Sequence, residues 1–150
     1  MMRERRFRFG ILAGCALVGA CFSLKIPHLR LPESYIESVE LCRKVEFRGD
    51  HLSPVEPRTV FGPRDDVICF IRLRNVPGKT RLRWKWYAPD QSLVRDTGDV
   101  EVHVDETALD MVTASDPLRP SSPMKTEGDW TVCVFINDTL AWVQKFVTKN

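Results

Sequence analysis

The sequence predicts an all-β protein, and three observations support this fold class. Apolar and polar residues alternate with a period of two in several short segments, as expected of strands that bury one face. Turn-forming residues separate these segments at intervals of about 8 to 12 residues. Beyond the N-terminal leader, no segment shows a helical period of useful length. The chain has 150 residues, 43% of them hydrophobic, which suits one domain with one buried core.

About six to seven antiparallel strands are expected. The candidate segments are 39–47, 67–74, 80–87, a short piece from 93, 100–105, 130–136 and 140–147. Segment 67–74 is apolar on both faces at first, which is typical of a central strand. The pair Pro77-Gly78 predicts a type II turn, because proline fixes one φ and glycine accepts a positive φ at the next position. We therefore expect segments 67–74 and 80–87 to form a hairpin.

The same periodicity predicts which side chains are buried. In segment 39–47 the inward residues are Val39, Leu41, Val45 and Phe47. Trp84, Trp86 and Trp130 fall on inner faces, so we expect them in the core. For Trp142 the pattern leaves two alternatives: a place in the core, or an exposed ring of the kind that stacks on sugars. The stretch 114–129 contains three prolines and is expected to be a long loop, with a turn at Asn137-Asp138 between the last two strands.

Two groups of residues resemble known β-sandwich domains. Cys69, Trp84 or Trp86, and Cys133 are spaced loosely like the cysteine, tryptophan and cysteine of immunoglobulin domains, although Thr131 stands where those domains have a tyrosine. The segment Gly128-Asp129-Trp130-Thr131-Val132, followed by a hairpin, is similar to the closing strands of small extracytoplasmic bacterial β-sandwich domains of unknown function. The resemblance implies an immunoglobulin-like β-sandwich over residues 36–150, with a binding or assembly role and no named ligand.

The N-terminus reads as an export leader. A basic start holds Arg3, Arg5, Arg6 and Arg8, and an uncharged stretch from Phe9 to Ala20 follows. Val18-Gly19-Ala20-Cys21 resembles the lipobox of bacterial lipoproteins, which implies a signal peptide over 1–20, a lipid on Cys21 and a tether over 21–35. Cys15 is the weaker site because Arg8 interrupts the apolar run before it.

The leader also predicts where the folded domain is. The alternative to cleavage at Cys21 is an uncleaved membrane anchor over 9–24, and both interpretations place the rest of the chain outside the cytoplasm. Phe22 and Ser23 follow Cys21, with no aspartate that would indicate retention in the inner membrane. We therefore expect a membrane-anchored, extracytoplasmic protein, with the outer membrane favoured if the source has two membranes.

The charge balance argues against nucleic acid as a partner. The chain has 22 Lys and Arg against 20 Asp and Glu, a formal net charge of +2. The leader holds four of the arginines and one glutamate, so the segment from Cys21 onward has a net charge of −1. A nucleic-acid partner would need a strongly positive field to collect phosphates, and no known reader motif is present.

One set of basic residues is a candidate anion-binding face. Period-two alternation places its five members on one exposed face of the expected hairpin: Arg72, Arg74, Arg81, Arg83 and Lys85. Like charges facing one another cost about 0.2 to 1 kcal/mol per pair unless a negative group lies nearby. The negative group is either an anionic envelope component or protein surface, or an internal set formed by Glu40, Glu46 and Glu101.

The face of the strand on which each cysteine lies does not decide how the cysteines pair. Cys42 and Cys133 point outward and can bond if their strands are neighbours, whereas Cys69 points inward. The alternatives are a bond between Cys69 and Cys133, or no bond at all. An oxidising compartment permits either bond. With Cys21 acylated, at least one thiol stays unpaired within the monomer.

No catalytic, metal or cofactor site is predicted. Glu101, His103 and Asp105 project to one side of a strand, but no fourth ligand is visible, so we interpret them as an ordinary polar face. Ser121 and Ser122 have no histidine placed to activate them. We expect a membrane-tethered β-sandwich that binds or assembles with another envelope component and is not an enzyme. The alternative is an envelope hydrolase or metal-dependent enzyme with an unrecognised site.

Overall fold

The computed structural model describes residues 35–49, 51–103, 111–119 and 126–149. These ranges contain eleven strands: β1 (Ile36–Cys42), β2 (Lys44–Arg48), β3 (His51–Val55), β4 (Val60–Phe61), β5 (Val67–Arg74), β6 (Lys79–Tyr87), β7 (Leu93–Asp96), β8 (Val100–His103), β9 (Met111–Leu118), β10 (Gly128–Ile136) and β11 (Thr139–Thr148). They contain no α-helix, so the all-β prediction is confirmed. The predicted signal peptide, Cys21 and the tether up to residue 34 lie outside the described residues. No helix in the described ranges is long and apolar enough to span a membrane.

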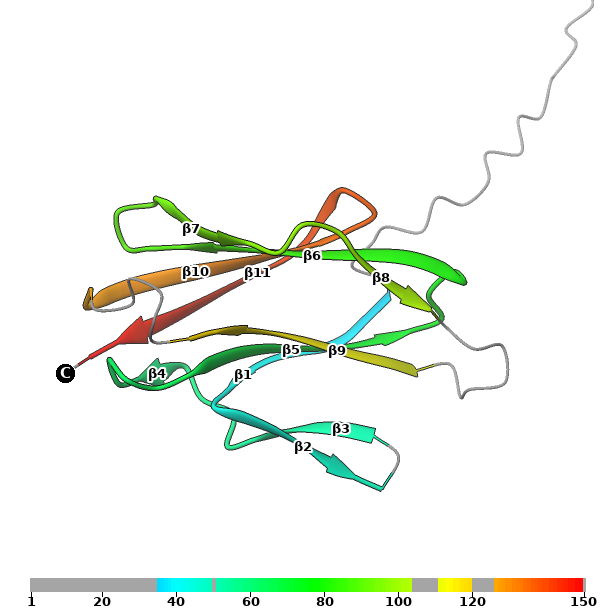
Figure 1. Cartoon of the computed structure of the whole chain (residues 1–150), viewed down its shortest axis with the longest axis horizontal. Helices are drawn as coiled ribbons and strands as arrows, with labels where there is room; N and C mark the ends of the chain where they lie inside the picture. The colour runs from blue at the N-terminus through cyan, green and yellow to red at the C-terminus, as the bar shows by residue number, and fades with distance from the viewer. Residues whose placement is uncertain (1–34, 50, 104–110, 120–125, 150) are drawn as a thin grey trace, which may run out of the picture.

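Most strands belong to two sheets. The smaller sheet has the order β1-β5-β9, and the larger has the order β4-β11-β10-β6-β7, with β8 paired to the other half of β6. Figure 1 shows the two sheets lying face to face, and β2 and β3 forming a separate hairpin beyond the smaller sheet. The strands outnumber the six to seven expected because the structure adds several short pairings, β4 with two residues among them.

The core lies between the two sheets. Trp84, Trp86 and Trp130 are all buried, as the alternation predicted. Phe146 of β11 stacks on Trp130 with ring centroids 6.0 Å apart, and it meets Trp86 and Phe61 edge-on at 6.0 and 5.7 Å. Aromatic pairs at such separations add about 0.5 to 1.5 kcal/mol beyond the burial of their area. Aromatic packing therefore fixes β11 to the core at its C-terminal end.

The expected hairpin between residues 67–74 and 80–87 is wrong. β5 belongs to the smaller sheet and β6 to the larger, so the connection between them crosses from one sheet to the other. The residue with a positive φ is Asn75, at 52°, and Gly78 is not among the residues with positive φ. Val76 is buried in the core, and the Thr80 hydroxyl donates to the carbonyl of Pro77 at 2.8 Å. The connection therefore joins two layers, with Val76 as its buried residue, and does not form a hairpin turn.

The single strand expected over 39–47 is also wrong. The first strand, β1, ends at Cys42, and β2 begins at Lys44. β2 pairs with β3 and does not continue β1. Phe47 is 76% exposed, contrary to its predicted inward position, whereas Cys42 is fully buried. Cys42 lies on the side of β1 that faces away from the core, as predicted, because it is not part of the core cluster that contains Leu41. It is buried because the β2–β3 hairpin packs against β1 and β5 on their outer side.

Two further predictions concern the second half of the chain. Residues 111–118 form β9, so part of the stretch expected as a loop is a strand. Pro117 is tolerated there because β9 pairs only with β5 among the described strands, and a proline without an N–H fits an edge strand. The turn at Asn137-Asp138 is confirmed, with φ of 48° and 65°, the left-handed pair that favours a two-residue hairpin.

Candidate binding surface

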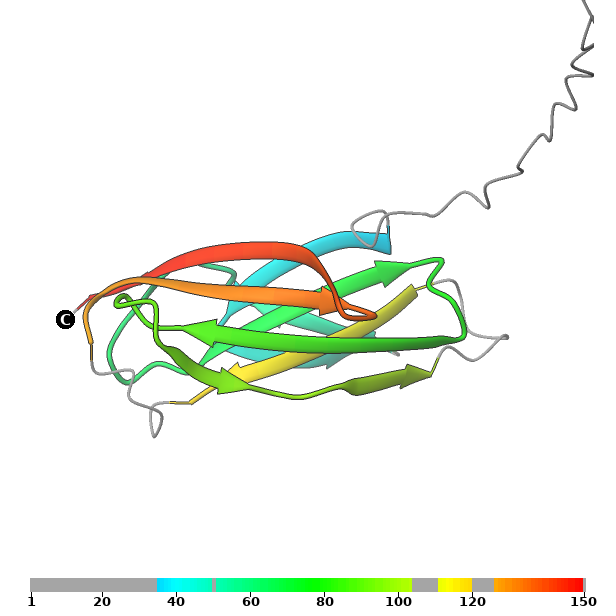
Figure 2. The same cartoon turned by 90° about the horizontal axis from the view of Figure 1, so that it is seen from above.

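The outer side of β11 is a largely unpaired strand edge of the larger sheet. On one side β11 pairs with β10 from Thr139 to Thr148, but on the other side β4 covers only Val147 and Thr148. Figure 2 shows β11 in red at one margin of the larger sheet, with β7 and β8 at the opposite margin. Among the described residues, therefore, no strand pairs with the outer side of residues 139–146.

The backbone of this segment points donors and acceptors toward the open side. The N–H of Val147 donates outward to the carbonyl of Thr59 at 2.8 Å. In an antiparallel strand the N–H and C=O of alternate residues point to the same side. Counting back in steps of two from Val147, the polar backbone groups of Lys145 and Val143 face outward as well. Each of these residues offers one donor and one acceptor to an added strand.

The side chains at this edge are unusually apolar for a surface. Leu140, Trp142 and Val143 are 47%, 38% and 48% exposed, and Val60 of the adjoining β4 is 47% exposed. A shallow depression of about 280 Å³ lies over residues 140–143. We refer to Leu140, Trp142 and Val143, with the outward backbone of Val143 and Lys145, as the β11 edge. Exposed apolar groups gathered on an unpaired strand are typical of a site for another protein chain.

A groove continues this surface toward the smaller sheet. It has a volume of about 310 Å³ and is lined by residues 39–41 of β1, residues 57–59 and Gln144. The indole N–H of Trp142 donates to the side-chain oxygen of Gln144 at 3.3 Å. Trp142 is therefore partly exposed at the side of the molecule where β1 and β11 meet, so the question left open by the sequence is answered: it is not a fully buried core residue.

The opposite margin of the larger sheet is tied to the smaller sheet. Arg95 of β7 donates from Nε and Nη2 to the two carboxylate oxygens of Asp116 on β9, at 3.0 and 2.7 Å. The indole N–H of Trp86 also donates to Asp116, at 2.7 Å. Asp116 is 6% exposed, and its hydrogen bonds raise the pKa of Arg95. Sequence reasoning missed this group, because Asp116 was placed in a loop.

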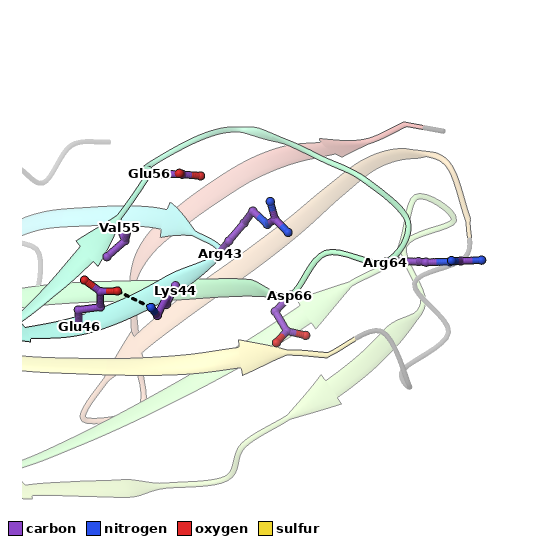
Figure 3. Close-up of a pocket in the computed structure, with 7 residues that line it drawn as sticks. All are labelled: Arg43, Lys44, Glu46, Val55, Glu56, Arg64 and Asp66. Atoms are coloured by element: carbon purple, nitrogen blue, oxygen red, sulfur yellow. Dashed lines mark hydrogen bonds and ion pairs between the residues drawn. The ribbon is translucent and has the colours of Figure 1, made fainter.

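A larger pocket lies near the β2–β3 hairpin. It has a volume of about 590 Å³ and is lined by Arg43, Lys44, Glu46, Val55, Glu56, Arg64 and Asp66. Figure 3 shows Lys44 and Glu46 meeting in an ion pair, while Arg64 extends away from the other side chains. The hydrogen bond from Lys44 lowers the pKa of Glu46. Arg43 pairs with Asp65 at 3.0 Å. Basic and acidic groups are thus mixed here, and the lining includes no serine, cysteine or histidine.

The structure divides the predicted basic face. Arg72 and Arg74 lie on β5 in the smaller sheet, and Arg81, Arg83 and Lys85 lie on β6 in the larger one. The prediction of one shared face is wrong because it depended on the hairpin that does not form. Arg74 pairs with Glu37 at 2.7 Å.

The basic residues of β6 are paired with aspartates. Arg83 donates from Nε and Nη2 to Asp96 at 2.7 and 2.6 Å, and this pairing lowers the pKa of Asp96 to about 2. Arg81 pairs with Asp138 at 2.5 Å and Asp99 at 3.4 Å. An internal set of acids was one of the two alternatives left open by the sequence. The acids that pair with Arg81 and Arg83 are these aspartates and not Glu40 and Glu46, while Glu101 lies opposite Arg81 in the β6–β8 register.

The candidate disulfide does not form. Cys42, Cys69 and Cys133 are all free, and Cys42 and Cys133 belong to different sheets. Each of these two side chains points away from the core. They therefore lie on opposite outer surfaces of the two sheets and are not neighbours. Cys69 is fully buried, and desolvation raises its pKa to about 12. Desolvation also raises the pKa of Cys133.

The remaining site predictions lie partly outside the described residues. Asp105, Ser121 and Ser122 are among the residues that the structure does not describe. Within the described part of the chain, no cluster of three or more histidine, cysteine, aspartate or glutamate side chains is placed to hold a metal ion.

Comparison with known proteins assigns no family. No protein-family model matches the chain, and no curated protein matches it. Similar solved structures include an immunoglobulin-like protein from Pseudomonas aeruginosa, with a TM-score of 0.47 and 17% identity over 77% of this chain and 94% of that one. An alkylpurine DNA glycosylase from Pseudomonas fluorescens has a TM-score of 0.45 and 9% identity, over 61% of this chain and 28% of its own. A β-glucosidase from Listeria innocua has a TM-score of 0.39 and 11% identity, over 75% and 16%. All three TM-scores are below 0.5, so these likenesses assign neither a family nor a function to the chain.

Proposed function

We propose that this protein is a membrane-tethered binding or assembly module of the bacterial cell envelope. Its folded part is an immunoglobulin-like β-sandwich, and a lipid on Cys21 holds it to the membrane outside the cytoplasm. The two facing sheets and the Gly128-x-Trp130-x-Val132 segment support the fold assignment. The basic start, uncharged stretch and Val18-Gly19-Ala20-Cys21 support the tether.

The observation that supports a binding role most strongly is the β11 edge. Its exposed apolar side chains have no partner strand among the described residues, and two residues direct backbone donors and acceptors outward. Strand addition to such an edge obtains affinity from main-chain hydrogen bonds and specificity from alternate side chains. A module that binds another protein chain by strand addition is therefore the function that this geometry supports best.

The alternative of an envelope hydrolase is not supported by a specific observation. The polar pocket of about 590 Å³ has mostly paired charges, and no nucleophile is among its lining residues. A hydrolase needs a nucleophile, a base and an electrophilic group that converge on one point. We therefore propose no activity for this pocket.

A photo-reactive amino acid at position 140 tests the proposed binding role. The full chain carrying it in place of Leu140 is irradiated in intact cells, and a matched chain carries it in place of Leu93, which is 51% exposed on β7. We expect a discrete cross-linked product from position 140 and none from position 93. Equal labelling from both positions, or no product from position 140, would contradict the proposal.

A second experiment tests the tether. Cys21→Ser should release the chain from the membrane fraction and abolish incorporation of a palmitate analogue, because the lipid is attached to that sulfur. Cys15→Ser should change neither result. Full retention of the Cys21→Ser chain on the membrane would show that the leader is an uncleaved anchor.

A further inference from the structure

We infer that the tip of the β2–β3 hairpin lies in the lipid surface to which the chain is tethered, with the ring of Phe47 inserted among the lipids. The hairpin tip is the last two residue pairs of the β2–β3 register: Phe47 with Leu52, and Arg48 with His51. The inference adds a second membrane contact to the proposed tether and therefore rests on that proposal. Three properties support it: the exposure of Phe47, the end of the domain at which the tip lies, and the small area that the tip offers.

Phe47 protrudes from the fold although it belongs to an apolar face. Val45 and Phe47 point to the same side of β2, and Leu52 and Pro54 lie opposite them on β3. Val45, Leu52 and Pro54 are half-buried, because the hairpin packs against β1 and β5. Phe47 is 76% exposed, the largest exposed fraction of any large apolar side chain in the described ranges. The packing that covers the base of this face therefore does not extend to the tip.

The tip lies at the end of the domain that the tether joins. Figures 1 and 2 both show β2 running back toward the end at which β1 begins, so the end of β2 and the start of β1 lie at the same end of the two sheets. The proposed tether over residues 21–34 joins the domain at this end, just before β1. A chain of that length spans at most ~50 Å when fully extended. The tip is thereby held within reach of the membrane to which Cys21 is attached.

The tip offers too little area for a stable protein interface, but it suits a lipid surface. One aromatic side chain buries about 150 to 250 Å². A standard protein complex buries ~800 Å² on each partner. A lipid surface needs no matching contour, and single apolar side chains can enter the boundary between headgroups and acyl chains. Since the tether already holds the domain at a high effective concentration beside the membrane, one inserted ring is enough to orient it. These properties favour lipid over another protein as the occupant of the tip.

The charges near the tip allow insertion without requiring an anionic lipid. Arg48 and His51 face each other on the side of the hairpin opposite Phe47, and both are exposed. Asp50 lies between them in the sequence, and Lys44 is paired with Glu46. This part of the chain therefore has no large excess of either sign. Burial of the apolar ring is the driving force, and salt does not screen it as it screens exposed charges, so the contact should persist at high salt.

Quenching by labelled lipids tests the inference in the full chain on a membrane. The chain is reconstituted in phosphatidylcholine vesicles that contain lipids with a nitroxide on the acyl chain, and an environment-sensitive fluorescent amino acid replaces Phe47. The matched chain carries the same amino acid in place of Leu93, which is 51% exposed but pairs with Tyr87, at the end of β6 far from the β5–β6 connection. We expect blue-shifted emission at position 47 and at least threefold stronger quenching there than at position 93, at low and at high salt.

Three results would overturn the inference. Equal quenching at positions 47 and 93 would show that the tip has no special contact with lipid, and an absence of quenching at position 47 would show that it has none at all. Blue-shifted emission at position 47 that the labelled lipids do not quench would show that a protein covers the tip instead.

A second comparison tests whether the ring itself causes insertion. The fluorescent amino acid is placed at position 51, and its quenching is measured with Phe47 intact and in Phe47→Ser, which should leave the fold unchanged because the ring is exposed. Phe47→Ser should reduce quenching at position 51 at least fivefold, whereas Leu93→Ser should not change it. Unaltered quenching in Phe47→Ser would overturn the role of the ring. The tether is tested separately, because membrane release of Cys21→Ser depends on the lipid anchor and quenching at position 47 is measured only in chains that are already membrane-bound.

Discussion

The two margins of the larger sheet differ in how they are closed. At the β7 margin, Arg95 and Trp86 donate to the buried carboxylate of Asp116, which joins the two sheets. At the β11 margin, Phe146 fixes one end of the strand to the core, while Leu140, Trp142 and Val143 remain exposed along the rest. The β7 margin is thus linked to the smaller sheet through a buried carboxylate, whereas the β11 margin presents exposed apolar side chains beside an unpaired stretch of backbone.

If the proposed binding role is correct, substitutions at the two margins should have different effects. Substitutions at the β7 margin should act on folding, since they break contacts between the sheets. Substitutions at the exposed half of β11 should act on association, since those side chains contribute little to the core. The predictions below test this division, beginning with the largest expected effect.

Within β11 itself, the two halves should respond differently. Phe146→Ala removes a ring packed against three aromatic side chains and should lower the free energy of unfolding by about 3 to 5 kcal/mol. Val143→Ala, at a half-exposed position, should change it by no more than about 0.5 kcal/mol. Urea unfolding followed by tryptophan fluorescence measures both. A loss at Val143 comparable to that at Phe146 would refute the division of the strand.

At the β7 margin, Asp116→Ala should cost about 2 to 3 kcal/mol. The substitution leaves the buried indole N–H of Trp86 without its acceptor, whereas the Arg95 guanidinium can turn to solvent because it is partly exposed. Asp99→Ala, which removes a long 3.4 Å exposed ion pair with Arg81, is the matched control and should be nearly neutral. Similar melting temperatures for the two variants would show that the link between the sheets contributes no stability.

The ion pair between Arg83 and Asp96 should make a smaller contribution to the free energy of unfolding, and this contribution should depend on pH. Arg83 holds the pKa of Asp96 at about 2, below the ~3.9 of an unfolded aspartate, so this pairing stabilises the folded state above pH 4. The contribution should disappear as the pH falls from about 4 to about 2. Asp96→Asn should flatten that part of the profile of unfolding free energy against pH. An unchanged profile in the variant would mean that Asp96 is not paired in solution.

The rates at which Cys69 and Cys133 react with a thiol reagent should show which of the two side chains is buried, without a change in stability. Cys69 is fully buried with a pKa of about 12, so it should resist a thiol reagent in the folded protein. Cys133 is half-buried on the outer face of β10 and should react first. Mass spectrometry after timed labelling gives the order. Modification of Cys69 ahead of Cys133 would contradict the burial of Cys69 in the core.

Local sequence patterns predicted the strands better than their partners. The alternation around Trp84, Trp86 and Trp130 identified the buried faces, because the period of two is a property of each strand alone. The Asn137-Asp138 turn was predictable for the same reason, since its two positive φ angles join adjacent residues of one hairpin.

Long-range pairing determined what the sequence did not reveal. The residues between β5 and β6 resemble a hairpin turn, but whether two consecutive strands share a sheet depends on β1, β9 and β10, which are distant in sequence. β9 was missed because Asp116 and Pro117 are unfavourable in an isolated strand, and both are accommodated only by Arg95 and by an edge position. The β11 edge was missed because it exists only where β4 ends.

Amide hydrogen exchange at the β11 edge tests the central claim most directly. In the dilute, detergent-solubilised full chain, the amides of Val143 and Lys145 should exchange much faster than the amide of Val147, which is bonded to Thr59. Equal protection of Val143, Lys145 and Val147 would show that the edge is already covered within one chain and would contradict the account.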